Sequence, residues 1–332
     1  MALKNYGVLK ARPIDRRLGF GASPHYQIHL VDNSADYRIA VNVKSKKSPS
    51  ELLYLIIENY VHPLLDDFKE LPAGFTSIER TPGGLALDYI RANLFKPDRM
   101  VPLPFDVPGP DNDLNEKIDY HVQRALAEED AMIYAFGERW GPEPNDRDKY
   151  FGFKPGNGIH DIHMNQGNVE EFQTDNGVWQ DGGMLLHLPA ENRWVAVFLA
   201  FQSQCWHTDD NTGNCIGDAQ QPAEDKGVVI IAGTVNPTGH DPGMERVLLL
   251  NTLAAAVDLN GWALADKNKR RHPLDGINLD PGAATVLTLP GTTIQLSNNG
   301  GIITLLNREG LKVHGVNYTK EDVSEQGRTI VF

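Results

Sequence analysis

Short apolar runs separated by turn residues fill the second half of the sequence and restrict what it can fold into. Eight such runs follow residue 227: VVIIAGTV, RVLLLNT, WALAD, ATVLTL, TTIQL, GIITLLN, LKVHGVNY and TIVF. The stretches between them lack the 3.6-residue period of an amphipathic helix. Closely spaced strands of this kind are typical of two packed antiparallel sheets. We therefore predict an all-β sandwich over residues 228–332.

This half of the chain resembles the lamin tail domain, an immunoglobulin-like fold. The resemblance rests on NPTGHDPGMERVLLLN, DLNGWALAD, LDPGAATVLTL and LSNNGGIITLLNREGLKVHGVNYT, and it covers about residues 228–332. It implies a binding or anchoring module with a protein or nucleic-acid partner. The polar segment IGDAQQPAEDKG, residues 216–227, contains Gly and Pro without apolar periodicity, and is predicted to be a linker.

Residues 1–215 mix strand and helix patterns. YGVLKAR, HYQIHLV, YRIAVNV, AMIYAFGERW, GMLLHLP and RWVAVFLAFQSQ are typical of strands, whereas SPSELLYLIIENYVHPLLDDF has helical spacing behind Ser48 or Ser50 as N-cap. A second helix is predicted in DLNEKIDYHVQRALAEED, where Asp111 or Asp113 can cap an apolar stripe. We therefore predict an α/β or α+β domain over residues 1–215.

Composition restricts the protein's environment and partners. No apolar run approaches the ~20 residues that a membrane helix requires, and the first residues lack the pattern of a signal peptide. A cytoplasmic protein without a membrane span is the expectation. The net charge of −13 argues against coating nucleic acid by bulk electrostatics, although a local basic cleft is compatible with it.

The first domain resembles the YukJ-like family. The resemblance rests on FGASPHYQIHLVD, PSELLYL, GGLALDYIRANLF, YAFGERWGPE, GNGIHDIHMNQGN and FLAFQSQCWHTDD, and it spans nearly all of residues 5–215. It identifies relatives without implying an activity, so the chemistry has to come from the residues. In YAFGERWGPE, Glu138 and Arg139 either line a cleft or form an ordinary ion pair beside a packed Trp140.

The segment GNGIHDIHMNQGN, residues 156–168, is the densest polar cluster of the chain. In an extended strand, Asp161, His163 and Asn165 project to one face, and His160 projects to the other. A possible internal duplication relates QIHLVDNSADYRIAVNVKS, residues 27–45, to DIHMNQGN together with RWVAVFLAFQS. The duplication would pair His29 with His163, and place beside them Lys44, Ser45, Gln202 and Ser203.

Two opposed histidines suit phosphodiester cleavage, in which one attacks phosphorus and the other protonates the leaving group. The arrangement resembles the phospholipase D superfamily, because Asp36 and Glu170 each lie seven residues after a His. The lysine that this superfamily places two residues after each His is replaced by Val31 and Asn165. The sequence thus favours a metal-independent phosphodiesterase acting on a phosphodiester or other small molecule. Its catalytic residues would be His29, His163, Asp161, Asn165, Lys44, Gln202 and Ser203, and it would need no cofactor.

Two alternatives stay open. A divalent metal such as zinc or manganese could bind in the His-Asp-x-His segment, with ligands drawn from His160, Asp161, His163, His207 and Asp209, and would activate water for hydrolysis. The chain could instead be a non-catalytic ligand-binding or scaffolding protein, in which the polar strand face recognises a ligand and residues 228–332 engage a partner.

Overall fold

The computed structural model divides the chain into two compact units. It describes residues 5–19, 25–44, 52–78, 90, 93–95, 99–103, 108–160, 182–201, 227–239, 241–268, 270–308, 310 and 312–332. The first unit comprises Met1–Tyr60 and Glu70–Ile216, and the second comprises Val61–Lys69 and Gly217–Phe332. Among the described residues, no helix is long and apolar enough to cross a membrane.

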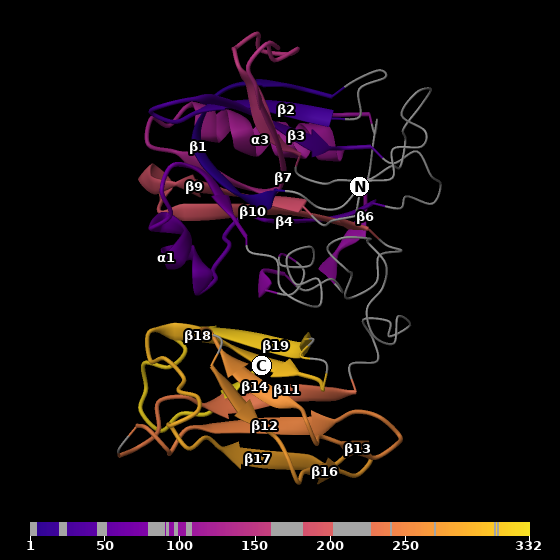
Figure 1. The fold of residues 1–332 in the computed structure, drawn as a ribbon, viewed down its shortest axis with the longest axis vertical. Coiled ribbons are helices and arrows are strands. Elements are labelled where there is room, and N and C mark those ends of the chain that lie inside the picture. Colours follow the sequence, from indigo (N-terminus) through magenta and orange to yellow (C-terminus); the bar gives the residue numbers. More distant parts are fainter. Residues whose placement is uncertain are drawn as a thin grey trace. The chain divides into compact units, whose positions relative to one another are not determined.

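A ten-stranded sheet forms most of the first unit (Figure 1). Its strands follow the order β5-β1-β2-β3-β8-β7-β9-β10-β4-β6. Their bounds are β1 Tyr6–Arg17, β2 His25–Val31, β3 Asp36–Asn42, β4 Leu52–Ile57, β5 Gly74–Ser77, β6 Val101–Pro102, β7 Met132–Glu143, β8 Gly156–His160, β9 Gly182–Leu188 and β10 Arg193–Phe201. The helices are α3, Leu114–Leu126, and the 3-10 turn η3, Pro189–Glu191.

Five of these strands close into a ring, because the long β1 pairs with two neighbours in succession. Tyr6–Ala11 of β1 pairs with β7, and Arg12–Arg17 pairs with β2. The ring continues from β2 to β3, from β3 to β8, and from β8 back to β7. All of these pairings are antiparallel except β3 with β8. The ring therefore runs β1-β2-β3-β8-β7-β1, and β9, β10, β4 and β6 extend the sheet beyond β7.

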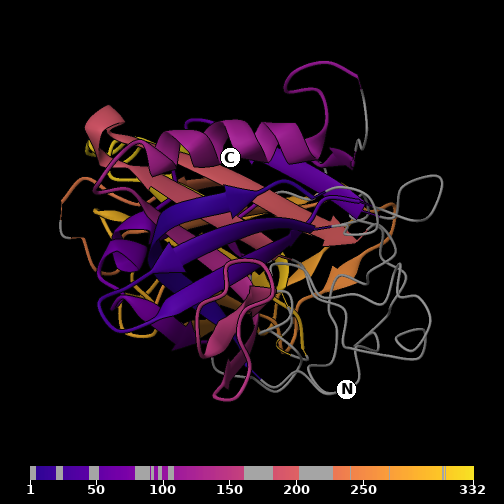
Figure 2. The ribbon, with the colours of Figure 1, turned by 90° about the horizontal axis from the view of Figure 1, so that it is seen from above.

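Alternation along the strands directs one set of side chains into a shared core. Tyr26, Ile28 and Leu30 of β2 are fully buried, while His25 and His29, which belong to the other alternating set, are only partly buried. The apolar stripe of α3, formed by Leu114, Ile118, Val122 and Ala125, belongs to the same core, and the helix lies across one face of the sheet (Figure 2). The polar side chains of β2 and β3 consequently lie on the opposite face of these strands.

The N-terminus of α3 follows directly from the sequence. The Asp113 side chain accepts a hydrogen bond from the Glu116 backbone amide at 3.0 Å, so it satisfies one of the free amides of the first turn. The side chain of Glu116 in turn accepts from the amide of Asn112 at 3.0 Å. Of the two caps expected from the sequence, Asp113 is the one that the structure uses.

In its described residues, the second unit contains strands and a single helix, α1, Leu64–Lys69. Its two four-stranded sheets have the orders β17-β12-β11-β20 and β15-β14-β18-β19, and β13 pairs with β16. Both larger sheets contribute to one core, for example Ile230 and Leu249 from one and Ile303 and Leu305 from the other. The bounds are β11 Val228–Thr234, β12 Arg246–Asn251, β13 Val257–Asp258, β14 Ala263–Asp266, β15 Arg271–Pro273, β16 Asn278–Leu279, β17 Ala284–Thr288, β18 Gly300–Leu306, β19 Lys312–Thr319 and β20 Ile330–Val331.

The first unit is richer in strand than the sequence suggested, and the expected α/β class fits it poorly. The segment predicted as one helix from residue 48 contains β4, Leu52–Ile57, followed by the separate helix α1. LLYLII is a short continuous apolar run, which suits a buried strand as well as a helix, and here it pairs with β10. The internal duplication of a phospholipase D-like fold is not confirmed, since residues 161–168 and 202–203 of its second half lie outside the described residues.

Candidate functional site

Two rows of side chains cross four strands on the outer face of the ring. Register aligns His29, Arg38, Gly158 and Trp140 in the first row, from β2, β3, β8 and β7. The second row contains Gln27, Ala40, His160 and Glu138 from the same strands. Each row thus contains polar and aromatic groups and one residue with little or no side chain: Ala40 lines the space above the strands, and Gly158 lies under the ring of Trp140.

Gly158 is required by this packing. A Cβ atom at this position would lie 2.1 Å from the Arg38 carbonyl oxygen and 2.3 Å from Cζ2 of Trp140. Such distances are far shorter than a normal contact, so a larger residue would displace the Trp140 ring or separate β3 from β8. The glycine lets Trp140 lie flat across β8 and reach the guanidinium of Arg38, whose Cζ is 4.6 Å from the ring centroid.

Arg38 is held in one orientation by four partners. Its Nε donates to Asp148 Oδ2 at 2.5 Å, and its Nη1 donates to Gln27 Oε1 at 2.6 Å. Its guanidinium also contacts two aromatic rings, those of Trp140 and Tyr150, and Cζ lies 4.9 Å from the Tyr150 centroid. Since a guanidinium has five N–H donors, these two hydrogen bonds leave further donors for a ligand.

Asp148 links Arg38 to the loop between β7 and β8, residues 144–155. Burial raises the pKa of this carboxyl group, but hydrogen bonds from Arg38 and from the amides of Phe151 and Tyr150 outweigh burial and lower it. Both amides donate to Asp148 Oδ1 at 2.9 Å. The carboxylate therefore fixes the loop above β3 while it neutralises part of the charge of Arg38.

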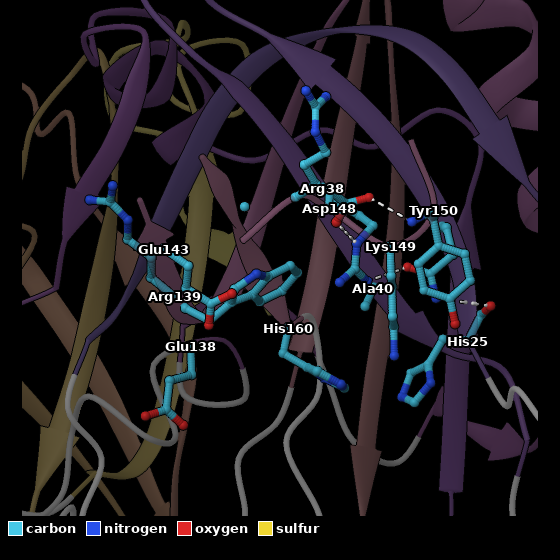
Figure 3. A pocket seen from close by; sticks show the side chains of 14 residues that line it. His25, Arg38, Ala40, Glu138, Arg139, Glu143, Asp148, Lys149, Tyr150 and His160 are labelled. Carbon is cyan, nitrogen blue, oxygen red and sulfur yellow. Dashed lines mark hydrogen bonds and ion pairs between the residues drawn. The ribbon is translucent and has the colours of Figure 1, made fainter. Parts of the chain in front are cut away.

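These groups line a cavity of about 560 Å³, a volume suited to a small ligand (Figure 3). Most of the lining residues belong to strands, and the loop between β7 and β8 contributes four of them. The lining consists of His25, Gln27, Arg38, Ala40, Glu138, Arg139, Trp140, Glu143, Arg147, Asp148, Lys149, Tyr150, Gly156 and His160. Glu138 and Arg139 thus line a cleft, as one of the two interpretations of their sequence proposed.

Two imidazoles meet at this cavity. The ring centroids of His25 and His160 are 4.8 Å apart, in an edge-to-face arrangement. Burial, and then the positive charges of Arg38 and Lys149, lower the pKa of His25 to about 4. At neutral pH the His25 ring is therefore uncharged and offers one nitrogen that accepts a hydrogen bond. Figure 3 shows the Lys149 side chain extending toward the same end of the cavity as both rings.

The lining carries four cationic side chains, Arg38, Arg139, Arg147 and Lys149, and three acidic ones. The ammonium of Lys149 lies 5.3 Å from the Tyr150 ring and has no carboxylate partner in the part of the chain that is described. Arg147 donates to the backbone oxygen of Gly152 at 2.9 Å. Positive charge is therefore available for an anion within a protein whose overall charge is strongly negative.

His29, a predicted catalytic residue, does not line this cavity. Its ring lies between Phe151 and Phe153, with centroids 4.9 Å from each, and its Nε2 is 2.8 Å from Asp36 Oδ1. These stacking contacts join β2 to the loop that carries Asp148. Arg17, at the end of β1, also contacts this loop, since its Cζ lies 5.3 Å from the centroid of the Phe151 ring. In this structure His29 positions the loop rather than facing the cavity.

The other predicted site residues divide between described and undescribed positions. Lys44 follows β3, where its amide donates to Asn42 Oδ1 at 3.3 Å, and it does not line the cavity. His160 ends β8 and does line it. The remaining predicted residues, which are Asp161, His163, Asn165, Gln202, Ser203, His207 and Asp209, lie outside the described residues together with Ser45. Within residues that are described, no group of three or more His, Cys, Asp or Glu side chains could hold a metal ion.

Sequence reasoning missed the centre of the site. Arg38 lies in the alternating segment YRIAVNV, where the pattern shows that it faces away from the core but not which residues lie beside it. His25 belongs to the same alternating set as Gln27 and His29, and that spacing was a usable signal. The loop residues Asp148, Lys149 and Tyr150 have no sequence pattern that places them above β3.

The first unit is thus a β-rich domain in which a closed ring of five strands carries an arginine-centred cavity. The family model described as "Uncharacterized conserved protein (DUF2278)" matches residues 1–213. The "Uncharacterized protein YukJ" of Bacillus subtilis (strain 168) is 44% identical over 222 residues, which are 66% of this chain and 96% of that protein. The chain belongs to the DUF2278 family, and the predicted YukJ-like relationship is confirmed. The lamin-tail resemblance stays a prediction.

Proposed function

We propose that this chain is a hydrolase that cleaves a phosphoester, and that the cavity around Arg38 binds the phosphate. The observation that carries the proposal is the contact between His25 and His160 on the wall of a cavity lined by four cationic side chains. Cationic N–H donors stabilise the charge that builds up on phosphate oxygens in the transition state. Imidazoles are the side chains most often used to transfer protons in such reactions.

Ligand binding would change the basicity of His25. Burial lowers the pKa of this residue most, and Arg38 and Lys149 lower it further. A bound phosphate would neutralise those two cations, so the pKa of His25 would rise toward its ordinary value and the ring would become a better base. In this proposal, His25 is coupled to the substrate through the same cations that bind it.

The short distance between the two rings restricts the mechanism. With centroids 4.8 Å apart, no phosphorus atom fits between the imidazoles, so they cannot act from opposite sides of one phosphate. One ring would exchange a proton with the substrate or with water, and the other ring would stabilise the charge on the first. The same restriction favours a second candidate function, in which the cavity binds a phosphorylated ligand without cleaving it.

Hydrolysis of bis(4-nitrophenyl) phosphate by the full-length protein, in buffer that contains a chelator, tests the proposal. We expect turnover that falls by 10²-fold or more in His25→Gln and in His160→Gln. The matched control is His187→Gln, because His187 stacks on Trp194 at 4.3 Å and does not line the cavity. Turnover lost in chelator and restored by zinc or manganese would favour the metal-dependent alternative instead.

Two further variants separate the present pair from the pair predicted by sequence. His163→Gln and His29→Gln remove the residues of the proposed duplication. If these two changes abolish turnover while His25→Gln and His160→Gln do not, the site proposed here is wrong. If the wild type itself has no turnover but still binds phosphorylated compounds, the chain is a binding protein.

We further propose that residues 228–332 form the lamin-tail-like, immunoglobulin-like binding module of this protein. The resemblance of the sequence and the two four-stranded sheets with a common core support this proposal. Every residue that lines the Arg38 cavity belongs to the first unit. A small reporter substrate should therefore be hydrolysed without any contribution from the second unit.

A further inference from the structure

The connectivity of the closed ring indicates which ligands it suits. Its five strands in chain order are β1, β2, β3, β7 and β8, and the fifth pairs with both the third and the fourth. The third and fifth strands are parallel, every other pair is antiparallel, and α3 precedes the fourth strand. This is the connectivity of the five-stranded Greek-key barrel known as the OB-fold, with β4, β5 and β6 inserted before the helix.

Barrels of this type bind chain-like ligands at one place. The ligand crosses the outer face of the second and third strands, beside the loops that join the first strand to the second and the fourth to the fifth. In this protein the second and third strands are β2 and β3, and residues 144–155 join the fourth to the fifth. The Arg38 cavity lies there, since β2, β3 and this loop all contribute to its lining.

The chemistry of this face distinguishes between the two ligands that such barrels take, oligonucleotides and oligosaccharides. Single-stranded nucleic acids are bound by positive charge along the backbone path and by aromatic rings on which bases stack. Arg38, Arg147 and Lys149 supply the charge, and the partly exposed Trp140 and Tyr150 supply the rings. A neutral oligosaccharide would not form an ion pair with Lys149, whose ammonium has no carboxylate partner among the described residues.

We propose that the ligand of the Arg38 cavity is single-stranded nucleic acid. The proposal deepens the proposed function and rests on it, because a nucleic-acid strand supplies the phosphodiester that the hydrolase would cleave. The overall charge of −13 confines binding to this local cluster, so a short strand is the expected ligand rather than a long coated one. Bases would stack at Trp140 and Tyr150 while a phosphate meets Arg38 and Lys149.

Fluorescence anisotropy with labelled twelve-nucleotide (dT)12 and (rU)12 strands tests the proposal on the full chain in chelator. We expect saturable binding of at least one strand and weaker binding of a duplex of the same length. In Lys149→Gln, affinity should fall about tenfold, and the dependence of log Kd on log salt should become shallower by about 0.7, as for one lost phosphate contact. Lys149 suits this test because, among the described residues, its ammonium contacts the Tyr150 ring and forms no ion pair.

Two other variants complete the test. Tyr150→Leu should weaken strand binding by about 5-fold to 150-fold, the usual cost of losing one stacked base. The matched control is Lys320→Gln, an exposed lysine of the second unit, which should bind as the wild type does. Equal affinity of Lys149→Gln, Tyr150→Leu and the control would overturn the assignment of the strand to this face.

The outcomes separate this inference from the function on which it rests. Hydrolysis of bis(4-nitrophenyl) phosphate without binding of either strand would overturn the nucleic-acid proposal and leave the hydrolase intact. Strand binding without hydrolysis of the reporter or of the strand would support the nucleic-acid proposal and overturn the hydrolase. Binding of hyaluronate oligosaccharides in place of both strands would also overturn the inference, since it would assign the face to an acidic carbohydrate.

Discussion

The environment of His25 predicts a specific dependence of stability on pH. The pKa of this residue is lowered from 6.5 to about 4 in the folded protein, first by burial and then by Arg38 and Lys149. Between these two values the unfolded chain binds a proton that the folded chain does not, so the folded state loses stability as the pH falls from about 6.5 to about 4. At about 1.4 kcal/mol per pKa unit, the loss from His25 alone amounts to about 3 kcal/mol.

Comparison with a variant isolates this contribution from those of other groups. Wild type and His25→Gln are unfolded with urea at pH 7 and at pH 4, with a signal that reports unfolding of the first unit. The two curves at each pH give the difference in unfolding free energy between the proteins. We expect the wild type to lose about 3 kcal/mol more than the variant between the two pH values. Parallel losses in both proteins would show that His25 titrates normally, and would refute the electrostatic description of the cavity.

Three further changes test the packing of the site and of the second unit. Arg38→Met leaves Asp148 buried without its cation and should cost about 3–5 kcal/mol in urea unfolding. Gly158→Ala places a Cβ against Trp140 and should cost about 1–3 kcal/mol, with altered tryptophan fluorescence. Burial raises the pKa of Glu245 from 4.5 to about 7, so the second unit should lose stability as pH rises from 4.5 through 7, and Glu245→Gln should remove this dependence in thermal unfolding.

Local sequence patterns identified most of the strands and the long helix. The Asp113 cap and the stripe through Ile118 and Val122 are signals contained within a few residues, and α3 confirms them. LLYLII could not be assigned in this way, because a continuous apolar run has no period and only its pairing with β10 makes it a strand. The α/β class failed for the same reason, since it depended on counting that segment as helix.

The site was harder to predict because it depends on register between distant segments. The need for glycine at position 158 arises only from its contacts with Arg38 and Trp140, which are 120 and 18 positions away in the sequence. The closure of the ring depends on β1 changing partners halfway along its length, from β7 to β2, and in YGVLKARPIDRR only Pro13, beside a register shift, lies near that change. His29 was chosen for its sequence neighbours, whereas His25, four residues earlier on the same strand face, lines the cavity.

The pKa of His25, measured by NMR with and without saturating inorganic phosphate, tests the central claim most directly. The His25 imidazole resonance is identified by its loss in His25→Gln. If the cations of this cavity hold a phosphate beside the ring, the pKa should rise from about 4 toward 6.5 when phosphate is bound, while that of His187 stays constant. A pKa of His25 that is the same in both conditions would contradict the claim that the Arg38 cavity binds phosphate.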